Sequence, residues 1–190
     1  MNSPKLPDLD ESCGDNFTFR DFIECAETWR LTGVENTPAQ PETYDALRLL
    51  AELVLDPVAS EFGRPALTYG VASHDLSKSI RKGIAPRLDQ HAGYELSSAG
   101  NPICDRGGIA CDFHVDGVSS LRVAQWIIQH TRFDLLYYYG EDRPIHVSAS
   151  RTPKGQCVLV KRDGSRSNMI PKVVSTEGFL KMKSFKGSKR

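Results

Sequence analysis

Several features that mark specialised classes of protein are absent from this sequence. No apolar run approaches the length of a membrane-spanning helix. The polar residues 1–8 do not form the basic-then-apolar pattern of a secretory signal. Neither Gly-x-x-x-x-Gly-Lys nor Gly-x-Gly-x-x-Gly occurs, so no phosphate-binding loop of these types is predicted. We therefore expect no membrane span, no nucleotide site of this kind and a cytoplasmic location.

Cysteine and net charge exclude further classes. The five cysteines are an odd number and none has CxxC spacing, so neither a disulfide framework nor a zinc knuckle is predicted. Lysine plus arginine equals aspartate plus glutamate, 24 against 24, which argues against a dedicated DNA-binding protein.

The charges are nevertheless unevenly spread. Residues 1–60 are mainly acidic and residues 61–190 mainly basic. The C-terminus is the most basic part, with Lys181, Lys183, Lys186, Lys189 and Arg190. A solvated, frayed tail is the ordinary interpretation of such a segment, and contact with an anionic partner is the alternative.

The length of 190 residues fits one domain with a full hydrophobic core. Residues 1–16 are rich in proline, aspartate and serine and predict a flexible lead. Residues 17–162 then form a single α+β domain of catalytic type, and residues 163–190 form the basic tail. Nothing in the sequence indicates an oligomeric state.

Hydrophobic periodicity predicts helices first and strands afterwards. Apolar spacing indicates helices over residues 18–29, 41–62, 73–80 and 118–130, and strands over 66–71, 108–115, 133–139, 145–150 and 156–160. Residues 81–107 show no clear period, and a loop of that length is uncommon unless it serves a site. The order predicts an α+β fold with a small antiparallel sheet, N-terminal helices and one crossover helix.

Three residues are candidate metal ligands: His91, Asp112 and His146, each beside strand-like residues. Two imidazoles and one carboxylate form a catalytic zinc set that leaves a fourth position for water. Asp112 stands within an apolar run, where a buried carboxylate must be paired, hydrogen-bonded or metal-bound. Ordinary structural roles for the two histidines remain the alternative.

The order of motifs resembles the D-alanyl-D-alanine carboxypeptidase-like zinc peptidases, which share a fold with lysostaphin-type enzymes and the hedgehog domain. Residues 17–22 resemble the opening helix of that family, and residues 67–73 stand where it has a Ser-Gly-Tyr-Arg-Ser strand end. Gly108-Ile109-Ala110-Cys111-Asp112 matches its Gly-x-Ala-x-Asp motif. Residues 133–136 and 145–148 resemble the final hairpin, which carries the last histidine ligand. The likeness covers roughly residues 17–150.

The resemblance implies a carboxypeptidase/hedgehog-like fold and a Zn²⁺-dependent hydrolase that cleaves a peptide or peptidoglycan-like bond. It implies His91, Asp112 and His146 as metal ligands. It also implies that Tyr69 and Ser73, in the strand-end motif, bind substrate.

The first metal motif departs from the family pattern. The family histidine stands seven residues before the aspartate, a position that Asp105 occupies here. Alternatively, an insertion has split the motif, since Asp89-Gln90-His91 resembles its Ser-x-His half. Imidazole suits zinc better than a second carboxylate, so His91 is favoured over Asp105.

Two more departures concern catalysis and substrate. A zinc hydrolase needs a carboxylate to move the proton of the attacking water. The family position for it holds Arg143, and Glu141 and Asp142 just beside it are the candidates, although a charged hairpin turn explains them equally well. Ala72 replaces the family arginine that pairs with a substrate carboxylate, so release of D-alanine from a free D-Ala-D-Ala end is expected to be weak.

Two other functions remain open at this point. The same fold could act on an altered cytosolic substrate, such as a nucleotide or nucleic-acid adduct. A degenerate domain could instead serve as a metal-binding or interaction module without hydrolysis.

Overall fold

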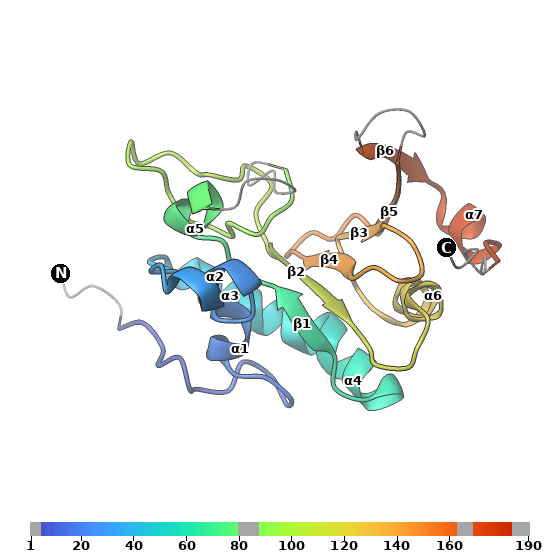
Figure 1. The fold of residues 1–190 in the computed structure, drawn as a ribbon, viewed down its shortest axis with the longest axis horizontal. Helices are drawn as coiled ribbons and strands as arrows, with labels where there is room; N and C mark the ends of the chain where they lie inside the picture. Colours follow the sequence, from blue (N-terminus) through green and yellow to red (C-terminus); the bar gives the residue numbers. More distant parts are fainter. Residues whose placement is uncertain (1–4, 80–87, 163–168, 184–190) are drawn as a thin grey trace.

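A six-stranded sheet organises the protein (Figure 1). The computed structural model describes residues 5–79, 88–162 and 169–183. The strand order is β1-β2-β4-β3-β5-β6, and every neighbouring pair is antiparallel except β3 and β5. The strands are β1 (Ala66–Tyr69), β2 (Ile109–His114), β3 (Leu135–Tyr138), β4 (Ile145–Ala149), β5 (Gln156–Arg162) and β6 (Met169–Val174). The α+β class is as predicted, but the sheet is larger than expected and includes one parallel pair.

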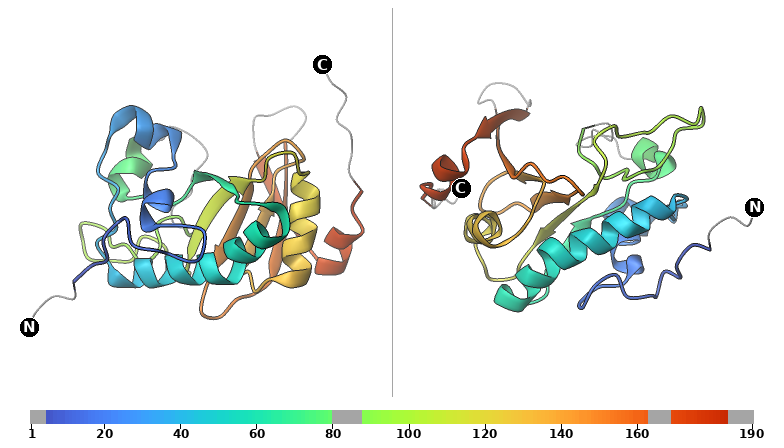
Figure 2. Two further views of the ribbon diagram at one scale, coloured as in Figure 1. Left: turned by 90° about the horizontal axis from the view of Figure 1, so that it is seen from below. Right: turned by 180° about the vertical axis from the view of Figure 1, so that it is seen from behind.

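Helices accompany this sheet. They are α1 (Phe19–Ile23), α2 (Glu27–Thr32), α3 (Pro41–Leu50), η1 (Ala51–Leu55), α4 (Asp56–Phe62), α5 (His74–Ser79), α6 (Ser120–His130) and α7 (Thr176–Leu180). Of these, α1, α3, α6 and α7 contact its strands. The elements α3, η1 and α4 join into one long rod across one face of the sheet, as Figure 2 shows. Since β2 and β3 are both antiparallel to β4, they run in the same direction, and α6 is the crossover between them. None of the helices within the described ranges is long and apolar enough to cross a membrane.

Alternation along β2 separates an apolar face from a polar one. Ile109, Cys111 and Phe113 are fully buried in the main core, which also contains the apolar side chains of the helical rod. Asp112 lies between two of them and is partly exposed. Successive strand residues point to opposite faces of a sheet. Asp112 therefore faces away from the rod.

The helical rod contains a widened turn where the sequence predicts a regular helix. Residues of η1 form a π-helical turn directly before Asp56 and Pro57. A proline has no backbone N–H, and in a regular α-helix the ring of Pro57 would clash with the carbonyl of Leu53. The π turn makes room for the ring, so the rod continues to Phe62 instead of ending at the proline.

The N-terminal region is more ordered than the flexible lead predicted for residues 1–16. Cys13 is fully buried. The carboxylate of Asp56 accepts the backbone N–H groups of Asp15 at 2.9 Å and Asn16 at 3.1 Å, which ties this segment to α4. The helix predicted over residues 18–29 is divided into α1 and α2, because Ala26 takes an extended backbone conformation. Residues 1–4 lie outside the described residues.

The C-terminal region also differs from the predicted tail of residues 163–190. Strand β6 pairs along its length with β5, and α7 follows it. Phe179 of α7 is fully buried and packs edge-on against Tyr138, with 5.7 Å between ring centroids. The segment 169–183 therefore belongs to the folded unit. Residues 163–168 and 184–190, with three of the five basic tail residues, lie outside the described residues.

The buried phenyl ring of Phe179 gives a test of this C-terminal packing. Because Phe179→Ala would leave a cavity between α7 and the sheet, we expect it to lower the free energy of unfolding by about 3–5 kcal/mol in chemical denaturation. Ile170→Ala is the matched control, since Ile170 on β6 is 54% exposed. Equal stability of the two variants would show that α7 does not pack on the sheet in solution.

Candidate metal centre

A row of polar and aromatic side chains crosses four strands of the sheet. Asp112 on β2 lies opposite His146 on β4. On the outer sides of this pair, Tyr69 of β1 lies opposite Asp112, and Tyr137 of β3 lies opposite His146. Directly opposed residues in antiparallel strands have side chains on the same face. The sheet register therefore brings the aspartate and the second histidine together.

His91 reaches this row from the loop that precedes β2. Its ring nitrogen Nδ1 lies 2.7 Å from the carbonyl oxygen of Gly70. Its own backbone carbonyl accepts the N–H of Ala72 at 2.9 Å. Gly70 passes so close to α1 that a Cβ there would lie 2.1 Å from the carbonyl oxygen of Phe22. The end of β1 thus fixes both the backbone and the ring of His91.

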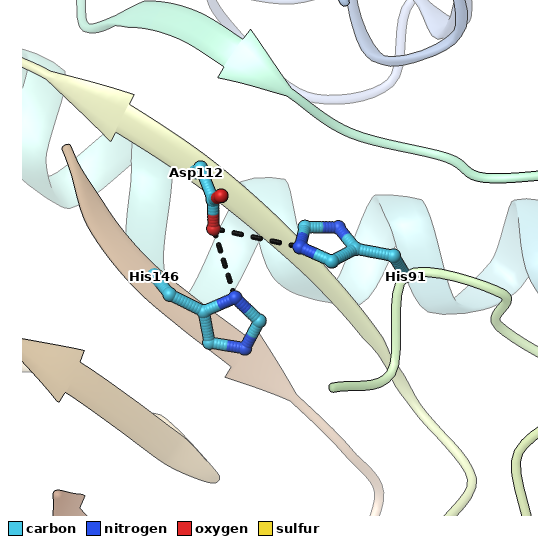
Figure 3. A group of neighbouring side chains, drawn as sticks. All are labelled: His91, Asp112 and His146. Carbon is cyan, nitrogen blue, oxygen red and sulfur yellow. Dashed lines mark hydrogen bonds and ion pairs between the residues drawn. The ribbon is translucent and has the colours of Figure 1, made fainter. Parts of the chain in front are cut away.

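The three predicted ligands converge on one carboxylate oxygen (Figure 3). Oδ1 of Asp112 is 3.4 Å from Nε2 of His91 and 2.8 Å from Nδ1 of His146. Both imidazoles are almost completely buried, at 3% and 2% side-chain exposure, whereas Asp112 retains 26%. Asp105, the alternative first ligand, is exposed in the loop and is not part of this group. The geometry therefore favours His91 over Asp105.

The hydrogen bond from His91 to Gly70 indicates what this group can bind. A carbonyl oxygen only accepts hydrogen bonds, so Nδ1 of His91 carries the proton. In the neutral ring, Nε2 then presents a lone pair to the negative oxygen of Asp112, an arrangement that requires a positive charge between them. That charge is either a proton on Nε2 or a metal ion. A carbonyl on the second nitrogen is also the usual way to orient a metal-binding histidine.

The distance between the ligand atoms of His91 and Asp112 fits a zinc site. In a tetrahedral zinc site, two ligand atoms lie about 3.3 Å apart, given the usual zinc–nitrogen and zinc–oxygen bond lengths. The 3.4 Å between His91 and Asp112 matches this value, whereas the 2.8 Å between His146 and Asp112 is a hydrogen-bond length. Nε2 of His146 is buried without a hydrogen-bond partner among the described residues. The types of donor atom and the spacing of the contact between His91 and Asp112 therefore suit a metal ion.

Electrostatic interactions at the centre favour a bound cation. Burial alone would raise the pKa of Asp112, but the charges and hydrogen bonds of His91 and His146 outweigh it and hold this pKa well below its usual range. For His91, burial acts to lower the pKa, yet the carboxylate of Asp112 reverses the effect and raises it. The carboxylate thus stays ionised and attracts positive charge to Nε2 of His91.

Aromatic rings enclose the two histidines. Tyr69 packs edge-on against His91 at 4.6 Å between centroids, and Tyr137 packs likewise against His146 at 4.9 Å. The hydroxyl of Tyr69 is buried and has no hydrogen-bond partner among the described residues. Tyr69, a predicted substrate-binding residue, thus lies at the centre. The sequence alone did not predict Tyr137 at the centre. The signal that could have found it is the short turn between β3 and β4, which sets the register that places Tyr137 opposite His146.

Ser73, the other predicted substrate-binding residue, is engaged elsewhere. Its hydroxyl accepts the N–H of Leu76 at 3.1 Å and so caps α5. The same hydroxyl donates to the carbonyl of Glu35 at 2.9 Å. Both of these bonds serve local structure, so the contacts of Ser73 give it a capping role.

The two predicted general bases lie in the turn between β3 and β4. The carboxylate of Glu141 accepts a hydrogen bond from Ser119, the residue before α6, and Asp142 is exposed. Neither belongs to the group of metal-ligand atoms. Asp89 offers a different carboxylate: its Oδ1 accepts the backbone N–H of His91 at 3.4 Å. Burial raises the pKa of Tyr69, and the charge of Asp89 raises it further.

The other candidate ligands considered in the sequence lie apart from the group. His114 contacts Asp116, with 3.1 Å between Nε2 and Oδ1. All five cysteines are buried, none forms a disulfide, and none joins the three ligands.

Comparison of the chain with protein-family models, with curated proteins and with solved structures finds no match to any of them.

Ala72, at the position where the resemblance to the zinc peptidases would place an arginine, is fully buried. Its N–H bonds the carbonyl of His91. Because there is no room for a guanidinium at this position, Ala72→Arg is expected to destabilise the fold by overpacking, by about 1–3 kcal/mol or more. Thermal denaturation measures the effect, with the exposed neighbour His74→Arg as control. A stable Ala72→Arg variant would mean that the end of β1 opens toward the site.

The ligand assignment predicts the metal content of single variants. We expect the purified protein to bind one zinc ion, and His91→Ala, Asp112→Ala and His146→Ala each to lose it, since each removes one of three ligands. Elemental analysis after dialysis against zinc measures this. Asp105→Asn and His114→Ala are the matched controls and should keep full occupancy. Loss of zinc in Asp105→Asn but not in His91→Ala would reverse the assignment.

Proposed function

We propose that this chain is a zinc-dependent hydrolase that holds its metal with His91, Asp112 and His146 and cleaves a peptide or peptidoglycan-like bond. The observation that carries the proposal is the buried Nε2 of His91, which is oriented by Gly70 and faces the ionised carboxylate of Asp112. A zinc ion held by two imidazoles and one carboxylate would supply a water of lowered pKa and would polarise a carbonyl group.

The proposal includes the carboxypeptidase/hedgehog-like fold. Three features support it: helices precede the sheet, the aspartate and second histidine lie on adjacent strands, and the first histidine comes from the segment before the aspartate strand. The split metal motif then corresponds to an insertion between His91 and β2. Fold alone does not imply an activity, so the argument for hydrolysis rests on the site.

The side chains around the centre have separate tasks in this proposal. The rings of Tyr69 and Tyr137 pack against the two imidazoles, restrict their rotation and exclude water from them. The exposed part of Asp112 lies on the side open to solvent. The hydroxyl of Tyr69 is buried beside His91 without a hydrogen-bond partner among the described residues, so a substrate would have to displace neighbouring side chains to reach it.

A carboxylate must also move the proton of the attacking water. Asp89 is the candidate that the contacts support best, because its carboxylate accepts the backbone N–H of the proposed ligand His91. Glu141 and Asp142 remain candidates from the sequence. A general base that takes the proton of the attacking water contributes on the order of 10²–10⁴-fold to the rate.

The buried Ala72 bears on the substrate. It provides no cation for a terminal carboxylate, which favours attack on an internal bond over release of D-alanine from a free D-Ala-D-Ala end. An altered substrate inside the cytoplasm agrees equally with this feature. A metal-binding module without hydrolysis is the second candidate, favoured by the engagement of Glu141 with Ser119 and by the exposure of Asp142.

Cleavage assays on the zinc-loaded protein test the proposal. We expect internal bonds of cross-linked muropeptides to be cleaved faster than peptides that end in D-Ala-D-Ala, and we expect no cleavage after zinc is removed. Mass spectrometry of the products identifies the bond. Stoichiometric zinc with no cleavage of either substrate would support the binding module instead.

Isosteric variants identify the proton carrier. Asp89→Asn should lower kcat on the order of 10²-fold or more while zinc stays bound, because the amide oxygen can still accept the N–H of His91. Glu141→Gln and Asp142→Asn are the matched comparisons and should retain most of the rate. Full activity in Asp89→Asn together with loss in Glu141→Gln would return the role to the hairpin turn.

A further inference from the structure

We infer that Gln90 is the positioning residue of the metal centre: its side-chain amide joins the three segments that carry His91, Asp112 and His146. The inference deepens the proposed function, since it treats His91 as a metal ligand. Gln90 itself is fully buried and does not belong to the ligand group.

Three hydrogen bonds satisfy the side chain of Gln90. Its Nε2 donates to the carbonyl of Gly107 at 2.6 Å and to Oδ2 of Asp134 at 3.0 Å. Its Oε1 accepts the hydroxyl of Ser148 at 2.8 Å. The partners are held in turn, because Ser148 also accepts the backbone N–H of Leu135 at 3.1 Å. Both amide hydrogens and the amide oxygen are therefore used inside the protein.

These partners also fix the orientation of the amide. Turning the group by 180° would direct Oε1 at the carbonyl of Gly107 and the carboxylate of Asp134, both of which only accept hydrogen bonds. Only one of the two orientations can make the bonds. A glutamate at this position would meet the same repulsion.

The three bonds connect the parts of the centre. Gly107 precedes β2, the strand of Asp112. Ser148 is two residues beyond His146 on β4, and residues two apart on a strand point to the same face. His91 is the next residue after Gln90. The bond to Gly107 therefore closes the loop of residues 91–106 and joins the two halves of the split metal motif.

The backbone at Gln90 supports this role. Gln90 is the one non-glycine residue with a positive φ in the described part of the chain, at 63°. This left-handed conformation is unfavourable for a side chain with a Cβ and persists where surrounding contacts hold it. Here it turns the chain so that the amide points to the sheet while the following imidazole reaches Asp112. The side-chain bonds are the contacts that hold the turn.

Two variants separate the side chain from the backbone turn. Gln90→Gly adopts a positive φ without strain but has no amide, so it tests whether the turn alone places His91. Gln90→Glu keeps the size of the side chain but cannot donate to Gly107. We expect both to bind zinc on the order of 10-fold more weakly than the unmodified protein in chelator competition, as is usual when an outer partner of a metal ligand is lost.

Asp56→Asn is the matched control for stability. It replaces the buried carboxylate of α4 that accepts two backbone N–H groups and lies outside the ligand group. It should therefore destabilise the fold and leave the zinc affinity unchanged. Zinc affinity in Gln90→Gly equal to that of the unmodified protein would overturn the inference.

A metal-free measurement tests whether Gln90 positions the ring of His91, even if the protein binds no zinc. The ring N–H of His91 that donates to Gly70 is observable by proton–nitrogen NMR. We expect this signal in the unmodified protein and in Asp56→Asn, and its loss or broadening in both Gln90 variants. A signal that persists in Gln90→Glu would show that Gly70 holds the ring without help, and Gln90 would then have no positioning role. Failure of the unmodified protein to bind zinc would refute the proposed function alone.

Discussion

The register between β2 and β4 is the constraint on which the centre depends. It places Asp112 directly opposite His146. A shift by one residue would turn every side chain of one strand to the other face and separate the pair. The apolar residues fix this register: Ile109, Cys111 and Phe113 on β2 and their alternating counterparts on β4 must all face the core. The hydrophobic pattern that folds the sheet thus also assembles two of the three ligands.

The third ligand depends on polar contacts that are costly to bury unless they are satisfied. Gln90 and His91 are buried in a segment without regular structure, where each polar group needs a partner. Glu95, four residues beyond His91, extends the same principle to the helical rod. Its carboxylate accepts the N–H groups of Ala39 and Gln40 and the hydroxyl of Thr43 at the start of α3. A negative charge at that helix end is favourable, so loop and rod stabilise each other.

The sequence predicted those parts of the fold whose signals are local. The amphipathic helices, the strands β2 and β4 and the chemistry of the donor set can each be read from a short window of residues. The break at Ala26 and strand β6 could not. Pro171 in β6 argues against a strand, and it is tolerated because β6 lies at the edge of the sheet, with only β5 beside it. Its partner strand had to be known before this segment could be recognised.

The difference between local signals and contacts of distant segments also explains why the sequence did not predict some residues around the centre. Histidine and aspartate are candidate metal ligands by residue type alone. A glutamine that positions such ligands can be recognised only from its hydrogen-bond partners. Those of Gln90 lie 17, 44 and 58 residues away along the chain. The role proposed for Asp89 likewise depends on contacts that only the folded loop shows. For Ser73, which the motif links to substrate, the structure shows a local capping bond to Leu76, and the substrate contact stays a prediction.

A long loop separates His91 from β2, and the cost of closing it bears on how His91 reaches Asp112. Lengthening a flexible loop costs little, since each doubling of its length adds only about 0.6 kcal/mol of closure free energy. The loop after His91 is therefore tolerable for stability, but it provides no short covalent link that would hold this histidine near the aspartate. A bond between the loop ends replaces that link. The amide of Gln90 and the carbonyl of Gly107 form such a bond across the base of the loop. Glu95 provides a second attachment within the loop, through its bonds to the start of α3. His91 is therefore held beside Asp112 by side-chain bonds rather than by a short covalent connection.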